Sequence, residues 1–370
     1  MNKKLLIRIG LSVLILALIL FACSRGESGG NVTNSPDVTV TVTPKPTPTP
    51  TSTPEITPTP VYNHPLTGRT LDEPFPYTRP FAISINDVPG ALPQCSIEGA
   101  DIIFEVLMEG ATRMVAIYSS LDGVGKIGSI RSVRPVSIDI ALAYDAILFH
   151  AGGSEPAYDQ IRTKEVDNID AVRGPFNESN STLYYREPSR ADRAWEHRLF
   201  SSDERLFKYF DEYGFRTEHE EGFDYGLLFT EDAAPEDGES ADTISVRYDY
   251  CGKTSAFTYS ENDNKYYMRQ YSQDYTDGNS GNNVGFENVL ILYTKARLTG
   301  DYLGHVDIET TGSGSGFFAC GGKYIEIIWS RNDREPFIFE TVDGEPLELN
   351  VGTTFVCCVP PTANSDVTFK

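Results

Sequence analysis

A proline-rich run near the N-terminus limits which part of this 370-residue chain can form a folded core. Residues Thr43 to Pro60 read TPKPTPTPTSTPEITPTP, with proline at nearly alternate positions. Proline lacks a backbone N–H, and the run has too few apolar residues to bury a core, so it favours extended polyproline II structure. We therefore predict a disordered Pro/Thr stalk over residues 23–62, with the globular part beginning near residue 63.

The residues before the stalk have the features of a secretion signal. Three basic residues precede an apolar segment from Leu11 to Phe21. This segment is too short for an ordinary membrane span, so we interpret residues 1–22 as a signal peptide. It ends in Leu-Phe-Ala-Cys, which resembles the bacterial lipobox, where the cysteine is acylated and becomes the new N-terminus. Cys23 is therefore predicted to carry the lipid, which would anchor the protein on the outer face of the bacterial cytoplasmic membrane.

The mature chain is strongly acidic. The whole sequence has 31 Lys+Arg and 53 Asp+Glu, and the signal peptide holds three of the bases and none of the acids, so the mature net charge is 28 − 53 = −25. Such a balance argues against a nucleic-acid partner or electrostatic attachment to a membrane surface. In so acidic a chain, clustered arginines are less easily explained as ordinary solvent-exposed surface residues.

The cysteine pattern does not suggest a disulfide framework or a cysteine-held metal. Five cysteines remain once Cys23 is acylated, and they include neither a CxxC pair nor a His/Cys spacing typical of zinc. We expect them to be buried as small apolar residues, with Cys357 and its neighbour on opposite faces of one strand. The five residues are Cys95, Cys251, Cys320, Cys357 and Cys358.

Residues 63–230 alternate between strand and helix patterns, which predicts an α/β layer domain. Helices are expected to begin at Pro135, to run from Ser154 to about Lys164, and to run from Ser202 to Tyr213. The last would place Leu206, Phe207 and Phe210 on one face. The polar segment Arg173 to Glu196 is longer than a simple connecting loop, so it is interpreted as a lid or flap. Strands are expected at Phe81–Ile85, Ile102–Leu107, Arg113–Ser119, Ala146–His150 and Asn168–Val172.

A second, smaller and β-rich domain is predicted over residues 241–370. The acidic stretch Glu231 to Ser240 lacks apolar periodicity and makes the best boundary. Seven short strands separated by turn-forming residues follow it. The glycine run Gly312 to Phe317 is interpreted as a loop between strands, because no helix or Lys-Ser/Thr pair follows it as a phosphate-binding loop would require. The strands are Thr243–Tyr250, Ala256–Tyr259, Lys265–Tyr271, Val289–Tyr293, Tyr324–Trp329, Pro336–Glu340 and Thr353–Val359.

One stretch between Lys126 and Ser154 concentrates the residues suited to an anion site. Arg131 and Arg134 precede the helix start at Pro135, and the strand ending at His150 leads into Gly152 and Gly153. Two helix N-termini, two guanidinium groups and a histidine could together bind an anion. Helix capping and internal salt bridges, to Asp101, Glu105 or Asp139, explain the two arginines equally well.

Other candidate residues have similar alternatives. Glu105 and Glu109 lie four apart, with Arg113 across a turn, so they form either cross-strand ion pairs or an acidic edge beside the arginines. His150 ends an apolar strand, where a histidine with satisfied hydrogen bonds is the commoner outcome, and Ser154 fits a helix cap. His197 could reach the same cleft.

Several blocks of the chain are similar to the YerB-like bacterial lipoproteins. They include NHPLTGR, RPFAISIND, GADIIFEVLMEGATRMVAIY, KIGSIRSVRP and EHRLF, in that family's order, and they cover most of Asn63 to Phe200. The resemblance implies a two-domain envelope protein, and it implies little about chemistry because the family's function is largely unknown. One departure is the turn after the first strand, which in the family usually reads Pro-Gln-Ser-Gly but here reads Pro-Gln-Cys-Ser, with Cys95 in a turn expected to be flexible.

Three functions are consistent with these features. The first, which we favour, is a noncatalytic binder of an anionic envelope ligand, such as a glycan, peptide stem or lipid head group. The second is an enzyme on wall polymers or lipid pyrophosphate, because the order of motifs is similar to that of the LytR-type phosphotransferases; only this alternative would use a divalent cation. The third is a scaffold that docks another envelope or spore protein. No other cofactor is expected.

Overall fold

The computed structural model describes residues 61–209, 212–362 and 366–370. The predicted signal peptide, Cys23 and nearly all of the predicted stalk lie outside this part of the chain, so those predictions stay untested by it. The described residues belong to one compact unit, which begins at Thr59. Within them, strands far outnumber the three α-helices, and no helix has the length and apolar character needed to cross a membrane.

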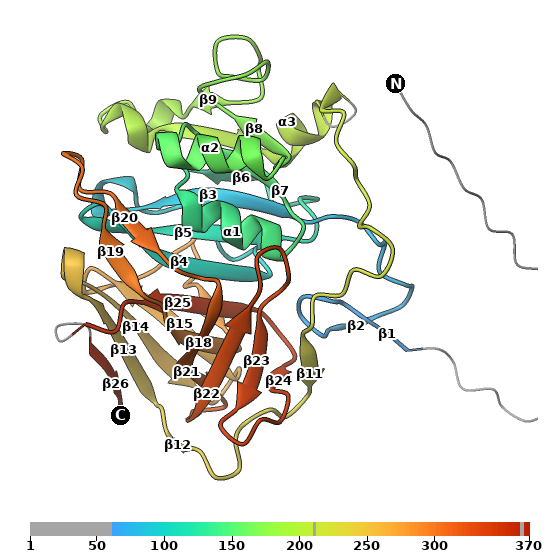
Figure 1. Ribbon diagram of the computed structural model, residues 1–370, viewed down its shortest axis with the longest axis vertical. Helices are drawn as coiled ribbons and strands as arrows, with labels where there is room; N and C mark the ends of the chain where they lie inside the picture. Colours follow the sequence, from blue (N-terminus) through green and yellow to red (C-terminus); the bar gives the residue numbers. More distant parts are fainter. Residues whose placement is uncertain (1–60, 210–211, 363–365) are drawn as a thin grey trace, which may run out of the picture. The chain divides into compact units, whose positions relative to one another are not determined.

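One eleven-stranded sheet contains strands from both the N-terminal and the C-terminal parts of the described chain (Figure 1). Its five N-terminal strands are β3 (Phe81–Asp87), β4 (Ile102–Met108), β5 (Ala111–Tyr118), β7 (Ile147–His150) and β8 (Asn168–Asp170). Its six C-terminal strands are β12 (Glu239–Ser240), β18 (Asn288–Tyr293), β21 (Gly312–Cys320), β22 (Lys323–Arg331), β23 (Ile338–Thr341) and β25 (Thr354–Val359). The two sets meet where β25 pairs in parallel with β4.

A second sheet of six strands and four smaller sheets complete the β structure. The six-stranded sheet contains β13 (Thr243–Tyr248), β14 (Lys253–Ser260), β15 (Lys265–Gln270), β16 (Gln273–Asp274), β17 (Gly285–Phe286) and β26 (Asp366–Phe369). The smaller sheets contain β1 (Tyr62–Asn63) with β2 (Thr70–Leu71), β6 (Lys126–Gly128) with β10 (Leu199–Ser202) and β9 (Tyr185–Arg186), β11 (Leu228–Thr230) with β24 (Glu348–Asn350), and β19 (Ala296–Leu298) with β20 (Val306–Ile308).

The helices are short and begin where the sequence indicates. Helix α1 (Pro135–Ala143) has proline at its first position, and α2 (Glu155–Thr163) is capped by the Ser154 hydroxyl, which accepts a hydrogen bond from the Ala157 backbone N–H at 3.4 Å. Both predicted starts are confirmed. Helix α3 (Asp203–Lys208) also begins at its predicted cap, Ser202.

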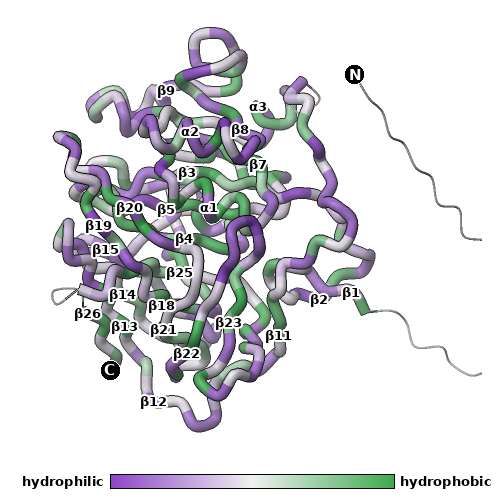
Figure 2. The backbone as a smooth tube through the Cα atoms, viewed as in Figure 1, coloured by the Kyte–Doolittle hydropathy of each residue, from purple (hydrophilic) through white to green (hydrophobic). Residues whose placement is uncertain are grey.

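The central strand β4 shows why the core lies where it does. All seven of its residues are buried, because each face of the strand is covered by a different layer. Phe104 packs against Tyr144, just after α1, whereas the neighbouring Glu105 points to the other face and meets Lys253 on β14. Strand β13 instead alternates buried with more exposed residues, as expected for a sheet with one face toward solvent. In Figure 2 the hydrophobic residues follow the central strands and α1.

Two predictions about local structure are wrong. Helix α3 ends at Lys208 rather than Tyr213, and Phe207 is exposed while Leu206 is buried, so the two do not share a buried face; Phe210 lies outside the described residues. The glycine run is not a loop but the first six of the nine residues of β21. A side chain at Gly316 would place its Cβ 2.3 Å from the Ile291 carbonyl oxygen, so glycine lets β21 approach β18 closely.

The N-terminal and C-terminal regions are joined more closely than the predicted boundary implies. Strand β11, before the acidic stretch, pairs with β24 near the C-terminal end, and β12 lies inside the stretch itself. Residues 63–230 and 241–370 therefore supply strands to the same sheets. The described chain is mostly β in both regions.

Candidate functional site

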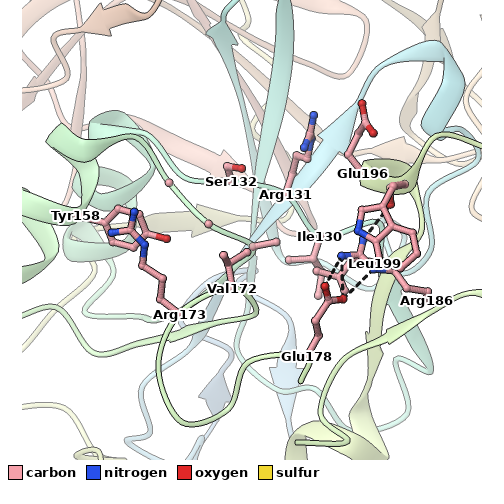
Figure 3. A pocket seen from close by; sticks show the side chains of 14 residues that line it. Ile130, Arg131, Ser132, Tyr158, Val172, Arg173, Glu178, Arg186, Glu196 and Leu199 are labelled. Carbon is pink, nitrogen blue, oxygen red and sulfur yellow. Dashed lines mark hydrogen bonds and ion pairs between the residues drawn. The ribbon is translucent and has the colours of Figure 1, made fainter. Parts of the chain in front are cut away.

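A pocket of about 400 Å³ lies at the carboxyl ends of β7 and β8. Its walls come from the segment before α1, the corner before α2 and the segment that follows β8 (Figure 3). The lining residues are Ile130, Arg131, Ser132, Ala151, Gly152, Gly153, Tyr158, Val172, Arg173, Glu178, Arg186, Trp195, Glu196 and Leu199.

The backbone around Arg131 is fixed on both sides. The Arg131 N–H donates to the Ser84 carbonyl of β3 at 2.8 Å, and its carbonyl accepts from the Ala151 N–H at 2.9 Å. Two residues later, the Val133 N–H donates to the Gly152 carbonyl at 3.0 Å. The segment thus lies between β3 and the glycine corner, the turn formed by residues 151–153. This position holds the Arg131 side chain at the pocket wall.

The Arg131 guanidinium makes no hydrogen bond and no ion pair with any residue that the structure describes, and its Nε is buried without a partner. Figure 3 shows it extending beside Glu196, which also lines the pocket. Burial lowers the pKa of Arg131, the Glu196 charge opposes that effect, and the neighbouring Arg134 adds to it. Arginine nevertheless stays charged at physiological pH. The pocket wall therefore carries a cation whose hydrogen-bonding capacity is unused.

Arg134 and Arg113 are held inside the protein instead. Arg134 binds both carboxylate oxygens of Glu109, with Nε–Oε1 at 2.6 Å and Nη2–Oε2 at 3.0 Å. The buried Arg113 donates from Nη1 to the Ser132 carbonyl. Burial lowers the pKa of Arg113 to about 9, and the charges of Arg134 and Arg131 contribute to the shift. Arg113 thus adds positive charge behind the pocket wall.

Glu105 and His150 face away from the pocket. Glu105 is fully buried against Lys253 on the opposite side of the sheet. His150 is also fully buried, with Nδ1 3.0 Å from the Gly152 carbonyl oxygen and Nε2 3.1 Å from Asn168 Oδ1. The histidine therefore helps to fix the Gly152 backbone. This is the structural role predicted as the commoner outcome, a buried histidine with satisfied hydrogen bonds.

The glycine corner depends on Asp170, which sequence reasoning missed. Gly152 adopts a positive φ of 74°, and its N–H donates to Asp170 Oδ1 at 2.7 Å. The other carboxylate oxygen accepts from the Tyr158 hydroxyl at 2.7 Å. Burial and this hydrogen bond both raise the pKa of Tyr158. The available signal was the position of Asp170 at the end of a strand, where side chains reach the crevice of a parallel sheet.

The remaining wall comes from the segment predicted to be a lid or flap. Arg186 forms a bidentate pair with Glu178, with both N–O distances 2.8 Å, and its guanidinium lies 4.2 Å from the centre of the Trp195 ring. On the opposite wall, Arg173 lies over the Tyr158 ring at 3.7 Å. The sequence indicated the segment by its length and polarity, but it did not identify these side chains.

Three predicted site residues, Arg131, Gly152 and Gly153, line the pocket. His197 lies outside it, and its Nδ1 accepts a hydrogen bond from the Asn86 amide at 2.9 Å. Burial lowers the pKa of His197. Across the described residues, no group of three or more His, Cys, Asp or Glu side chains is arranged to hold a metal ion, and the five described cysteines are free thiols.

Comparison with known proteins identifies relatives along most of the chain. Residues 66–216 match the N-terminal domain of a protein of unknown function, DUF3048, and residues 244–356 match its C-terminal domain. The putative lipoprotein YerB of Bacillus subtilis (strain 168) is 27% identical over 303 residues, which are 80% of this chain and 86% of the relative.

A solved structure shares the fold. The crystal structure of the YerB protein from Bacillus subtilis superposes with a TM-score of 0.70 over 83% of this chain and 99% of that chain, at 24% identity. Together the two domain models account for more than half of the residues, in the same order as in the family. The chain therefore belongs to the YerB-like family of two-domain DUF3048 proteins.

Proposed function

We propose that this protein is a lipid-anchored envelope protein whose pocket binds the anionic group of an envelope ligand. The observation that supports this proposal most directly is the Arg131 guanidinium, which lines the pocket without a hydrogen-bond or ion-pair partner among the described residues. A phosphate or carboxylate matches a guanidinium in charge and geometry. Glycans, peptide stems and lipid head groups outside the cell all carry such groups.

The location rests on the N-terminal sequence and on the relative. The basic start, the apolar run and Cys23 fit a lipoprotein signal, and the B. subtilis relative is named as a putative lipoprotein. We infer that acylation of Cys23 anchors the chain on the outer face of the cytoplasmic membrane. The stalk would then act as a spacer of about 3.1 Å per residue.

The pocket is biased toward anions by its charges. Of the five charged lining residues, Arg186 and Glu178 neutralise each other, and Arg173 pairs with Glu155 at the rim. This leaves Arg131 facing Glu196, with Arg113 behind the wall. In a chain of net charge −22, this local concentration of guanidinium groups supports anion binding.

The surrounding topology also favours a ligand here. We infer that residues 63–230 form an α/β layer, because β3, β7 and β8 are parallel, α1 leads into β7, and α2 connects β7 to β8. Crevices outside the carboxyl ends of parallel strands are the usual binding sites of such layers. A catalytic site built from the predicted residues would bring Glu105, Arg113, Arg131, Arg134 and His150 into one cleft. Glu105 and His150 face away from the pocket, so we favour binding over catalysis.

The proposal predicts a specific loss of affinity in Arg131→Ala. Removing one charge-assisted hydrogen bond should weaken anion binding by about 1.5–3 kcal/mol, which is about 10- to 150-fold in Kd. The assay is calorimetric titration of the purified protein with pyrophosphate and with muropeptides that carry free carboxylates. Arg297→Ala, in an exposed ion pair with Asp307, is the matched control and should bind as the wild type does. Equal affinity in Arg131→Ala and wild type would refute the assignment.

A further inference from the structure

A buried polar cluster lies between the two large sheets, separate from the pocket. Lys253, the first residue of β14, points at strands β3 to β5 of the eleven-stranded sheet. Its Nζ donates to Asp87 Oδ2, to Glu105 Oε1 at 2.8 Å and to the Thr112 hydroxyl at 2.6 Å. The side chains of Asp87 and Glu105 are 0% exposed and that of Lys253 is 3% exposed. A lysine and two carboxyl groups are thus in mutual contact away from water.

The charges of this cluster do not balance. One lysine faces two carboxyl groups, and among the described residues Asp87 Oδ1 and Glu105 Oε2 are buried without hydrogen-bond partners. Two buried carboxylates with unpaired oxygens are unfavourable beside a single ammonium group, because one positive charge cannot neutralise both. Burial, the largest effect, raises the pKa of Asp87 to about 6, although Lys253 opposes it. The site therefore holds one lysine and two carboxyl groups, with one more acidic group than basic group.

The reacting groups are held rigidly on both sides. Asp87 and Thr112 are paired residues of β3 and β5, and the Thr112 hydroxyl donates to Asp87 Oδ2 at 3.0 Å. Ser255, two residues after the lysine, donates to Glu105 Oε1 at 3.0 Å. The Tyr271 ring covers the ammonium group at 5.1 Å. Groups fixed in contact within a desolvated site react as if at very high concentration.

We propose that Lys253 and Asp87 become joined by an intramolecular amide bond, with Glu105 as the group that transfers protons. The ion pair is the starting state, and transfer of one proton from Lys253 to Asp87 gives a neutral amine and a neutral carboxylic acid. Nζ then attacks Cγ of Asp87. Glu105 accepts a proton from the attacking nitrogen and passes it to the departing hydroxyl group.

The products account for every atom. The ammonium and the carboxylate lose one water molecule and form one amide. The C–N bond replaces a C–O bond, and Glu105 ends in the state in which it began. No oxidant, reductant or external reactant is consumed. The amide is neutral, so the reaction removes a buried ion pair, and the low dielectric of the site favours this change.

The bond would connect the two regions matched by the family models. Asp87 belongs to the N-terminal match and Lys253 to the C-terminal match, and they are 166 residues apart. It would also tie the eleven-stranded sheet to the six-stranded sheet. This inference is independent of the proposed function, because the pocket and the cluster share no residues.

The test is peptide mass spectrometry of the full-length protein after unfolding and trypsin digestion. Trypsin does not cut at Arg79, because Pro80 follows it, so Asp87 lies in the peptide 70–113; an unmodified Lys253 is cut, giving peptides 248–253 and 254–265. We expect instead one species in which 70–113 is joined to 248–265, lighter than their sum by one water molecule. Fragmentation should place the link at Asp87.

Two variants and one internal control complete the test. Lys253→Met should abolish the linked species, and folded Glu105→Gln, checked by circular dichroism, should reduce it at least tenfold. Lys164 and Asp139 form a partly exposed pair at 3.1 Å in the same protein and should stay unlinked. Full recovery of the separate 248–253 and 254–265 peptides from folded wild type would overturn the proposal. An equal yield of linked species in Glu105→Gln would overturn the role given to Glu105.

Discussion

Replacing Arg134 with alanine should destabilise the fold and leave anion binding intact, in contrast to Arg131→Ala. The change removes both hydrogen bonds to Glu109, from a pair whose side chains are only 13% and 19% exposed. The remaining basic neighbours of Glu109 are Arg113 and His305, whose Nε2 lies 3.6 Å from Oε1. Loss of such charge-assisted contacts should lower the free energy of unfolding by about 1.5–3 kcal/mol. Both side chains keep some contact with solvent. The loss should therefore stay below the roughly 3–5 kcal/mol expected when one partner of a fully buried ion pair is removed.

A double-mutant cycle with Glu109→Gln measures the pair directly. Urea unfolding of the wild type, both single variants and the double variant should give a coupling energy of about 1–2 kcal/mol. The matched control is the Arg297–Asp307 pair, which has a similar N–O distance of 2.7 Å but side chains 77% and 39% exposed. Its coupling should be clearly smaller, because water screens it.

The same pair predicts a pH dependence. Burial opposes ionisation of Glu109, but Arg134 outweighs it, so the pKa of the carboxyl lies below its ordinary value of 4.5. A folded-state pKa below the unfolded one gives stability that is complete above about pH 4.5 and is lost as the pH falls toward the folded value. Glu109→Gln should remove this part of the acid sensitivity. Two results would refute the separate roles given to Arg134 and Arg131. One is an Arg134–Glu109 coupling energy no larger than that of the Arg297–Asp307 pair, and the other is weakened anion binding in Arg134→Ala at unchanged stability.

The remaining predictions concern the anchor, the stalk and the sheet. Cys23→Ala should yield uncleaved or released protein in cell fractionation, and processed protein that still fractionates with membranes would contradict acylation. A chain starting at Thr59 should melt at the same temperature as the full ectodomain, whereas a large loss of cooperativity would show that the stalk packs on the folded part. Gly316→Ala should destabilise by about 1–3 kcal/mol, measured by urea unfolding, because its Cβ would meet the Ile291 carbonyl oxygen at 2.3 Å; wild-type stability would contradict the close approach of β18 and β21.

Features fixed by neighbouring residues could be predicted from the sequence. The helix start at Pro135 and the cap at Ser154 follow from the first turn of each helix, and the structure confirms both. Arg131 could be placed near the glycine corner because only a short strand and helix separate them. Its distinction from Arg134 could not be predicted, since that depends on Glu109, 25 residues away along the chain.

Features that depend on distant partners were not predictable in this way. Glu105 lies in a strand that the sequence predicts, but the buried partner of its carboxyl group is Lys253, 148 residues later. The glycines of β21 indicate a loop by composition, but they are needed where neighbouring strands approach closely. The flap side chains Arg186 and Trp195 lie in a segment without periodicity, so no local pattern assigns them to the pocket.

The parallel pairing of β25 with β4 has a consequence for how the chain folds during synthesis. The ribosome delivers the N-terminus first, so β4 emerges some 250 residues before the strand that completes it, which matches the separation of Ile102 from its partner Thr354. Until then one edge of β4 presents unpaired backbone groups, which are a template for association with other chains. An isolated N-terminal region would keep that edge permanently. Completion of the polypeptide through β25 therefore covers an edge that the N-terminal region alone cannot cover, so the two matched regions depend on each other for a closed sheet.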